Sequence, residues 1–269
     1  MHDVIHAILL GIVEGFTEFL PVSSTAHLLV SEKLLGLSGD RWEAFTIVIQ
    51  LGAILSVVAV YWRKIWDVTI GLPSDPGARK FAAGVVIAFL PSAVLGATLI
   101  KFINSHLLNP TIAMPVIATS WIAGGLIILV FERMVPKPRF ADADALPLMK
   151  CLQIGFCQCL ALLPGVSRSG ATILGGELLG VERKAAAEFT FYLAVPTMLG
   201  AAVFELYKKW DLLSASDEKI IAVGFVVSFL VALVVVKTFI AFIGRYGLKP
   251  FGWYRIATGL ALFGFMLWG

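Results

Sequence analysis

Six long apolar stretches constrain the fold of this chain more than any other feature of its sequence. They are residues 45–62, 81–100, 111–131, 189–206, 220–243 and 251–268. Each approaches the roughly 20 residues that a helix needs to cross the hydrocarbon core of a bilayer. The sequence is only 14% charged, whereas soluble domains are about 25% charged. We therefore predict an all-α polytopic membrane protein.

Two further apolar segments are each interrupted by a turn. The first runs from Val4 to Leu37 with a break at Pro21, and the second runs from Cys151 to Val181 with a break at Pro164-Gly165. Proline lacks a backbone N–H and disfavours helix in the residue before it, so a helix should end at each break. The resulting halves, of about 10 to 17 residues, are too short to span a bilayer and predict two re-entrant hairpins.

The two broken segments resemble each other at a fixed offset of 144 residues. Between positions 11 and 46, eight residues are identical to the residue 144 places later, namely Gly11, Val22, Ser23, Leu34, Leu35, Gly36, Phe45 and Thr46. Each half then has one re-entrant hairpin followed by three transmembrane helices, an odd number, so the second half enters from the opposite side. We predict an inverted repeat within a single membrane domain, with halves at about 1–140 and 145–269 and the broken helices meeting near the midplane.

The distribution of lysine and arginine between the loops predicts the orientation. With the N-terminus outside, the inner loops hold twelve of these residues and the outer loops hold six. The inner ones are Arg63, Lys64, Arg79, Lys80, Arg133, Lys137, Arg139, Lys150, Arg183, Lys184, Arg245 and Lys249. Basic residues are enriched in cytoplasmic loops, so we expect both termini on the outer side.

The first break carries two carboxylates at bilayer depth, where ionisable groups are costly and usually functional. Glu14 and Glu18 are four residues apart and share one face of a helix. Hard carboxylate oxygens suit Mg²⁺ or Ca²⁺, so we predict that the pair holds a divalent cation. The alternative is that both glutamates are only structural partners of an arginine in the second break, Arg168.

Hydroxyl groups and an imidazole follow the same break. Ser23, Ser24 and Thr25 are suited to begin the next helix. With Ser24 at the N-cap, His27 falls at the third helical position, where the two side chains can meet. The alternative for His27 alone is a helix-capping role.

The second break is predicted to bind an anion, in particular phosphate. We take Arg168 to be the only arginine deep in an apolar segment. A guanidinium offers paired donors that match phosphate oxygens, and the start of a helix adds free N–H groups and positive potential. The neighbours assigned to the same site are Ser167, Ser169, Gly170 and Thr172. The alternative is a structural kink in which Arg168 pairs with Glu14 or Glu18.

Together the breaks offer what phosphoryl transfer requires: charge stabilisation, a positioned nucleophile and proton handling. Arg168 serves the first need, Ser24 or a water the second, and His27 the third. Gln50 and Glu188 are weaker candidates for lining the site. The competing hypothesis is a transporter or flippase of a polyprenyl phosphate lipid, because carriers also bind substrate at broken helices.

At these residues the chain closely resembles the BacA/UppP family of bacterial undecaprenyl-diphosphate phosphatases. Members show an acidic ExxxE element that runs into PVSST-x-H, and a second PGxSRSxxT element. Here these are Glu14–Glu18, Pro21–His27 and Pro164–Thr172. The likeness covers nearly the whole chain.

The resemblance implies hydrolysis of undecaprenyl diphosphate to the monophosphate and phosphate, which recycles the lipid carrier for the cell wall and confers bacitracin resistance. It implies a multi-pass protein of the bacterial inner membrane, in contact with membrane lipid and not nucleic acid, whose site opens to the periplasm. It assigns Ser24 and His27 to the nucleophile and acid–base positions, Arg168 to phosphate binding, and Glu14 and Glu18 to the divalent cation or to activation. The attacking group and a homodimeric assembly stay open. The substrate-binding group of the prediction consists of Ser23, Thr25, Ser167, Ser169, Gly170 and Thr172.

Overall fold

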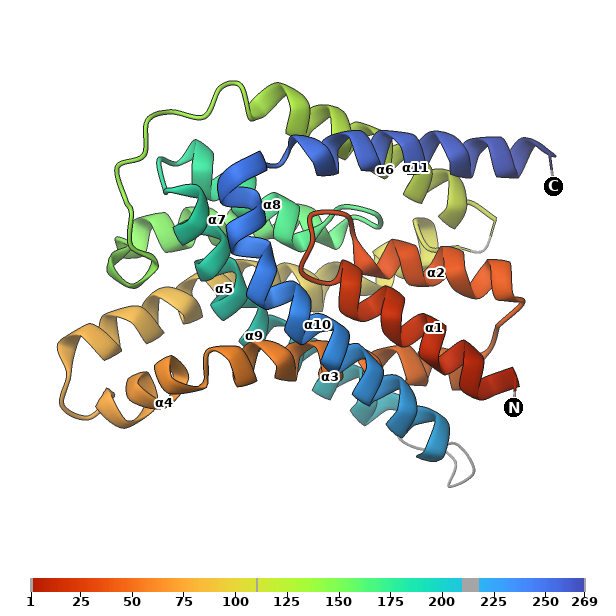
Figure 1. The fold of residues 1–269 in the computed structure, drawn as a ribbon, viewed down its shortest axis with the longest axis horizontal. Helices are drawn as coiled ribbons and strands as arrows, with labels where there is room; N and C mark the ends of the chain where they lie inside the picture. Colours follow the sequence, from red (N-terminus) through yellow and green to blue (C-terminus); the bar gives the residue numbers. More distant parts are fainter. Residues whose placement is uncertain (1, 110, 210–217, 269) are drawn as a thin grey trace.

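The computed structural model describes residues 2–109, 111–209 and 218–268. In this part of the chain the fold is helical, and the only strand-like pairing is an isolated bridge between Phe140 and Val181 (Figure 1). In chain order the elements are α1 (His2–Thr17), α2 (Ser24–Leu35), α3 (Asp40–Val60), α4 (Trp62–Gly71), α5 (Pro76–His106), α6 (Ala113–Phe131), η1 (Ala143–Ala145), α7 (Leu148–Gln158), η2 (Cys159–Leu162), α8 (Arg168–Leu178), α9 (Arg183–Lys209), α10 (Glu218–Tyr246) and α11 (Lys249–Trp268).

Five helices in the described ranges are long and apolar enough to cross a membrane: α3, α5, α6, α9 and α10. They cover all or most of five of the six expected spans, and the prediction of an all-α polytopic membrane protein is confirmed. The sixth stretch, residues 251–268, is also helical and forms most of α11. It is not among the five helices that are long and apolar enough to cross a membrane.

The segment expected to be a cytoplasmic loop between Arg63 and Lys80 contains a helix. α4 directly follows α3, and its exposed Trp62 and Trp66 stack with ring centroids 5.6 Å apart. The next helix, α5, starts where the Asp75 side chain accepts a hydrogen bond from the Gly77 N–H at 2.8 Å. α4 was not among the helices predicted from the sequence.

The two broken segments form the expected helix–turn–helix pairs, α1–α2 and α7–α8. Each first arm packs against a long helix of the other half, α1 on α10 and α7 on α5. Glycines permit this close approach: a Cβ on Gly15 would lie 2.5 Å from the Ser228 carbonyl oxygen, and one on Gly155 would lie 2.4 Å from that of Ala88. The inverted orientation of the halves stays a prediction.

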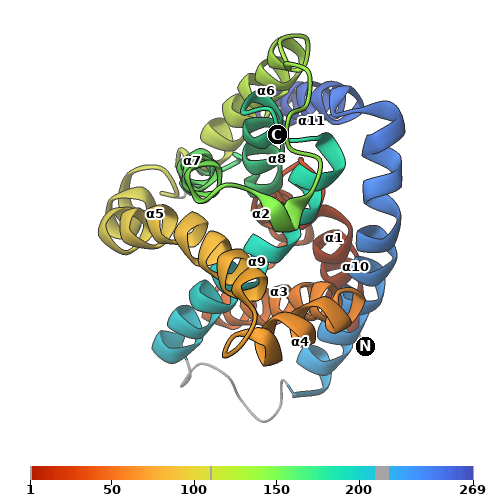
Figure 2. The same cartoon turned by 90° about the vertical axis from the view of Figure 1, so that its left-hand side faces the viewer.

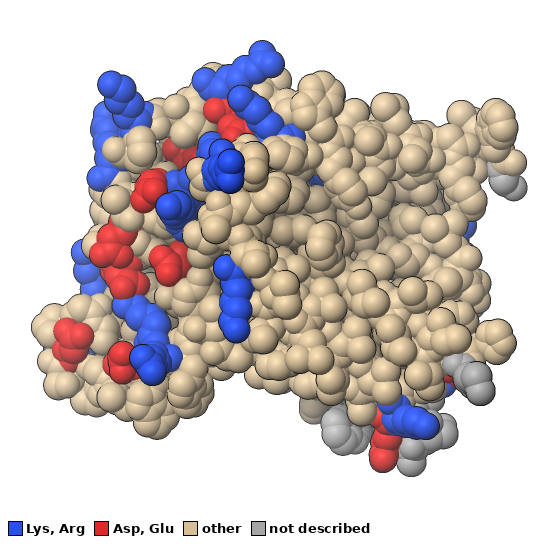
Figure 3. All heavy atoms as spheres, in the orientation of Figure 1, with Lys and Arg blue, Asp and Glu red and all other residues tan. Residues whose placement is uncertain are grey.

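α8 and the start of α2 lie inside the bundle, with α5, α10 and the α6–α11 pair around them (Figure 2). Between the halves, the fully buried Phe19 of the first half packs against Phe191 of the second half, with ring centroids 5.5 Å apart. Both chain ends lie at the same end of the molecule in Figure 1. On the face drawn in Figure 3, charged side chains gather mainly at the opposite end, over α4 and the segment after α6.

Candidate active site

The first break is the turn that joins α1 to α2. It contains Pro21 and then Ser23, whose φ of +71° is rare for a residue with a side chain. α2 begins at Ser24, so Ser23 occupies the N-cap position, without a side-chain capping hydrogen bond. The prediction that Ser24 is the N-cap is wrong by one residue. The Ser24 hydroxyl is directed elsewhere and donates to Glu18 Oε2.

The second break joins η2 to α8. Gly165 has a φ of +84°, and a Cβ there would lie 2.7 Å from Ser120 Cβ, so only glycine fits this turn. Ser167 caps α8 by accepting a hydrogen bond from the Gly170 N–H at 3.1 Å. Arg168 is the first residue of α8, which places its guanidinium group at the positive end of the helix dipole.

The two breaks are in direct contact. Ser169 Oγ donates to the Leu20 carbonyl at 2.8 Å, and Ser167 Oγ donates to the same carbonyl at 3.3 Å. Arg168 Nη2 donates to Glu18 Oε1 at 3.1 Å. Glu18 therefore binds Ser24 with one oxygen and Arg168 with the other. Arg168 therefore pairs with Glu18, as the structural alternative predicted. Phosphate binding by Arg168 stays a prediction.

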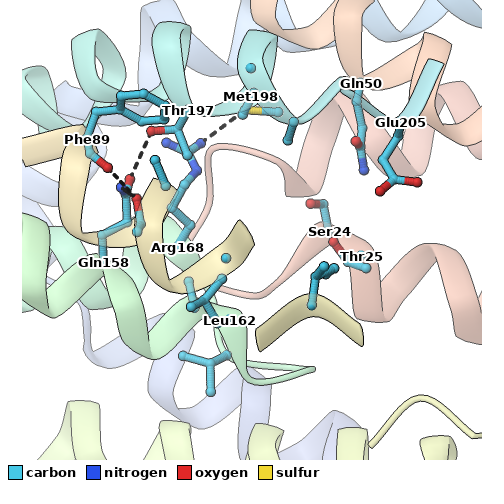
Figure 4. Close-up of a pocket in the computed structure, with 18 of the residues that line it drawn as sticks. Ser24, Thr25, Gln50, Phe89, Gln158, Leu162, Arg168, Thr197, Met198 and Glu205 are labelled. Atoms are coloured by element: carbon cyan, nitrogen blue, oxygen red, sulfur yellow. Dashed lines mark hydrogen bonds between the residues drawn. The ribbon is translucent and has the colours of Figure 1, made fainter. Parts of the chain in front are cut away.

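A cavity of about 530 Å³ opens beside these contacts (Figure 4). It brings together six of the predicted site residues, which come from both breaks. They are Glu18, Ser23, Ser24, Thr25, Ser167 and Arg168. In Figure 4 Ser24 and Thr25 lie on one side of the cavity, and Arg168 lies on the other side, next to Gln158 and Thr197.

The rest of the cavity is mostly apolar and runs between α5 and α9. Small side chains widen it there, and an aromatic ring contributes from each helix: Gly96, Ala97, Gly200, Ala201, Phe89 and Phe204. Of the two weaker candidates, Gln50 lines the cavity and Glu188 is not among its lining residues. The cavity thus joins a polar end to a long apolar flank.

Four polar lining residues were not predicted: Ser92, Gln158, Thr197 and Glu205. Gln158 Nε2 donates to Ser92 Oγ at 2.6 Å, and Thr197 Oγ1 donates to Gln158 Oε1 at 3.4 Å (Figure 4). A signal for Gln158 was present in the sequence, because it lies 144 residues after Glu14. The offset that relates the two breaks therefore pairs a carboxylate with an amide.

His27 does not meet Ser24, although the sequence predicted that the side chains come together. Its Nδ1 lies 2.8 Å from the Ser23 carbonyl, which can only accept, so Nδ1 carries the proton. Nε2 then accepts from the Tyr254 hydroxyl at 2.9 Å, and the two rings stack. His27 is not among the cavity-lining residues. Its acid–base role stays a prediction that this geometry does not support directly.

Ser169, Gly170 and Thr172 also lie behind the cavity wall rather than in it. Thr172 Oγ1 donates to the Arg168 carbonyl at 2.9 Å and accepts from Thr190 Oγ1 at 2.9 Å. These bonds hold the first turn of α8. In this structure the three residues support Arg168, and direct contact with substrate stays a prediction for them.

Glu14 is completely buried one turn before Glu18, and neither of its carboxylate oxygens has a hydrogen-bond partner among the described residues. A buried carboxylate without a partner is costly, so the position suits a ligand that brings positive charge. Among the described residues no group of three His, Cys, Asp or Glu side chains is arranged to hold a metal. A cation here would take two carboxylates from the protein and its other ligands from elsewhere.

Arg255 was missed by the sequence analysis. It is the fifth residue of the last apolar stretch, and its side chain is 2% exposed in α11. The prediction that Arg168 is the only arginine deep in an apolar segment is therefore wrong.

The family model described as bacitracin resistance protein BacA matches residues 7–261 of the chain. The chain is 49% identical over 258 residues to an undecaprenyl-diphosphatase of Rhodopseudomonas palustris (strain TIE-1), covering 96% of this chain and 95% of the relative. It is 51% identical over 256 residues to undecaprenyl-diphosphatase 2 of Paramagnetospirillum magneticum, covering 95% and 96%. A third relative, an undecaprenyl-diphosphatase of Sphingopyxis alaskensis, is 49% identical over 260 residues, with 96% of each chain covered.

Proposed function

The chain belongs to the bacitracin resistance protein BacA family, and we propose that its cavity hydrolyses undecaprenyl diphosphate to undecaprenyl phosphate and inorganic phosphate. This reaction returns the lipid carrier to cell-wall synthesis and removes the diphosphate that bacitracin sequesters. The protein is a multi-pass membrane protein, so a lipid substrate can reach the cavity from the bilayer.

One observation carries the proposal: Glu18 joins Ser24 to Arg168 at the polar end of a cavity whose flank is apolar. A polyprenyl diphosphate has the same division between a charged head and a hydrocarbon tail. The head suits the guanidinium and the start of α8, while the tail suits the small residues of α5 and α9.

The proposed hydrolysis uses the side chains of Glu18, Ser24 and Arg168. A diphosphate that enters the cavity competes with Glu18 for Arg168, and the planar guanidinium stabilises charge on the terminal phosphoryl oxygens. Ser24 Oγ, whose hydrogen bond goes to Glu18, gives its proton to that carboxylate and attacks the terminal phosphorus. The bond to the bridging oxygen breaks and undecaprenyl phosphate leaves. Water then hydrolyses the phosphoserine and releases phosphate, which restores the serine.

A divalent cation, Mg²⁺ or Ca²⁺, fits the carboxylates of Glu14 and Glu18. The unpartnered oxygens of Glu14 are hard ligands of the kind that such a cation would take. When bound, the cation would neutralise charge on the diphosphate and make it easier to attack. Glu14 and Glu18 would hold it next to the first break.

We place the protein in the bacterial inner membrane with the charge-rich end of Figure 3 in the cytoplasm and both termini in the periplasm. The twelve basic residues assigned to inner loops support this orientation. The catalytic cavity would then receive its substrate from the periplasmic side.

The deciding experiment is phosphate release from undecaprenyl diphosphate by the purified protein in detergent with Mg²⁺ or Ca²⁺. A flippase of polyprenyl phosphate would move a labelled lipid between leaflets of a liposome and release no phosphate. The Glu18–Ser24 hydrogen bond favours the hydrolase, because a carrier does not need an activated hydroxyl.

A further inference from the structure

Arg255 is a buried cation without a counter-ion among the described residues. It lies in α11, and none of the ion pairs formed by the described residues includes it. A buried charge is costly unless it is fully hydrogen-bonded, so its position calls for a function that α11 packing alone does not need.

Backbone carbonyls from three separate segments surround its guanidinium group. Nη1 donates to the Pro21 carbonyl at 3.3 Å, and Nη2 donates to the Gly165 carbonyl at 3.0 Å. α6 supplies the Ser120 carbonyl, which is 3.0 Å from Nη2, and the Trp121 carbonyl, which is 3.5 Å from Nε. One side chain thus binds both breaks and anchors them to α6 and α11.

The two carbonyls in the breaks are equivalent in sequence, because Pro21 and Gly165 are separated by the same 144 residues that relate the two broken segments. Pro21 lies three residues before Ser24, and Gly165 lies three residues before Arg168. A bond to both carbonyls therefore sets the distance between the hydroxyl and the guanidinium that the proposed reaction uses.

We propose that Arg255 is a positioning residue that holds the two breaks in register, an inference that rests on the proposed function for its catalytic consequence. Arginine suits this task because two different nitrogens of a rigid plane reach the two breaks, whereas the single ammonium of lysine cannot keep both directions. Arg255 is not among the cavity-lining residues, so it acts through the breaks rather than on the substrate.

The surroundings of the guanidinium group allow a variant that displaces it without removing its charge. Gly124 on α6 leaves room for the guanidinium group of Arg255, because a Cβ at position 124 would lie 2.2 Å from Arg255 Nη2. Gly124→Ala should push the guanidinium away from the carbonyls. Gly264→Ala is the matched control, because a Cβ at Gly264, which also lies on α11, meets nothing within 4 Å.

We expect Arg255→Lys, Arg255→Met and Gly124→Ala to lower kcat for phosphate release by about a hundredfold, as a misplacement of about 1 Å can do. KM should stay within about threefold, because the apolar flank of the cavity is untouched. Gly264→Ala and Arg245→Lys should behave like the wild type. Wild-type kcat in both Arg255→Met and Gly124→Ala would overturn the proposal. An increase in KM with an unchanged kcat would overturn it as well.

A distance measurement tests the same proposal without activity. Spin labels at Leu34→Cys on α2 and Leu160→Cys on η2 use exposed positions outside the cavity lining, in protein whose native cysteines are replaced. We expect the distance distribution to broaden or shift in Arg255→Met and in Gly124→Ala, but not in Gly264→Ala. An unchanged distribution would overturn the positioning role, and so would loss of folded protein in both variants.

The two measurements separate this proposal from the proposed function. If the wild type releases no phosphate, the function is refuted while the label distances still report on Arg255. If the wild type is active and the distances do not respond, only the positioning role is refuted.

Discussion

Arg168 Nη2 lies 3.1 Å from Glu18 Oε1 although the two residues are 150 positions apart in the chain. The contact joins the start of α8 to the end of the first hairpin arm. Both side chains are largely buried, so breaking the pair without a replacement charge would be costly. A diphosphate supplies that replacement, which makes the contact both a structural link in the empty protein and the place where we propose the substrate binds.

We expect Arg168→Lys to fold and to lose about a hundredfold in phosphate release, because one lost charge-assisted contact in the transition state is worth on the order of 3 kcal/mol. Lysine keeps the charge and loses the paired donors. Turnover with undecaprenyl diphosphate measures the effect, and Arg245→Lys on the exposed end of α10 is the control. Near wild-type turnover in a folded Arg168→Lys protein would rule out the phosphate-binding role.

Double-mutant cycles can identify the partner of Ser24. Since its hydroxyl bonds to Glu18 and not to His27, we expect the losses in Ser24→Ala and Glu18→Gln to be strongly non-additive. The losses in Ser24→Ala and His27→Ala should instead multiply. Phosphate release at saturating Mg²⁺ measures all the variants, with folding checked separately.

The contrary results of these cycles are informative. If Ser24→Ala and His27→Ala together are scarcely worse than either alone, the pairing predicted from the sequence holds and the bond to Glu18 belongs to the empty protein. If Ser24→Ala keeps substantial activity, water is the nucleophile and Ser24 only positions Glu18.

Removing one carboxylate should weaken cation binding before it alters the fold. We expect Glu14→Gln to lower the affinity for Mg²⁺ or Ca²⁺ by about tenfold or more, because the amide oxygen is a weaker ligand than a carboxylate. Calorimetric titration with each cation gives the affinity, and Glu218→Gln at the exposed start of α10 is the control. Equal affinity in Glu14→Gln and the wild type would remove Glu14 from the cation site.

Orientation can be read from two isosteric substitutions. Ser74→Cys lies in the exposed turn after α4, and Ser38→Cys lies in the exposed turn after α2. In a background without Cys151, Cys157 and Cys159, an impermeant thiol reagent applied to intact cells should label position 38 and not position 74. Labelling of position 74 in intact cells would reverse the orientation proposed for the protein.

The glycine contact between α1 and α10 should contribute to stability. A Cβ at Gly15 would lie 2.5 Å from the Ser228 carbonyl, so Gly15→Ala must separate the two helices. We expect a loss of about 1–3 kcal/mol in the free energy of unfolding. Thermal unfolding in detergent compares it with Gly264→Ala, which should be close to neutral. An unchanged midpoint of thermal unfolding in Gly15→Ala would mean that α10 can move away from α1 without loss of stability.

The apolar stretches and their interruptions were sufficient to predict the helices and the two breaks, because hydrophobic length and proline act locally along the chain. The glutamates, the hydroxyls and Arg168 could be selected for the same reason, since a polar residue inside an apolar run is visible in one dimension. α4 was not predicted, because its ten residues are too few to span a bilayer and include Arg63, Lys64 and Asp67, so the segment was taken for a loop.

Which polar groups touch was decided by tertiary structure alone. A hydroxyl at the start of α2 has several acceptors within reach of its rotamers, and packing of the two hairpins directs Ser24 to Glu18 and leaves His27 with Tyr254. Arg255 lies within an apolar stretch that predicted only a membrane span, and the fold alone brings two distant breaks within reach of its guanidinium group. Burial in a bilayer can be read from the sequence, whereas the partners of a buried group depend on contacts between segments more than a hundred residues apart.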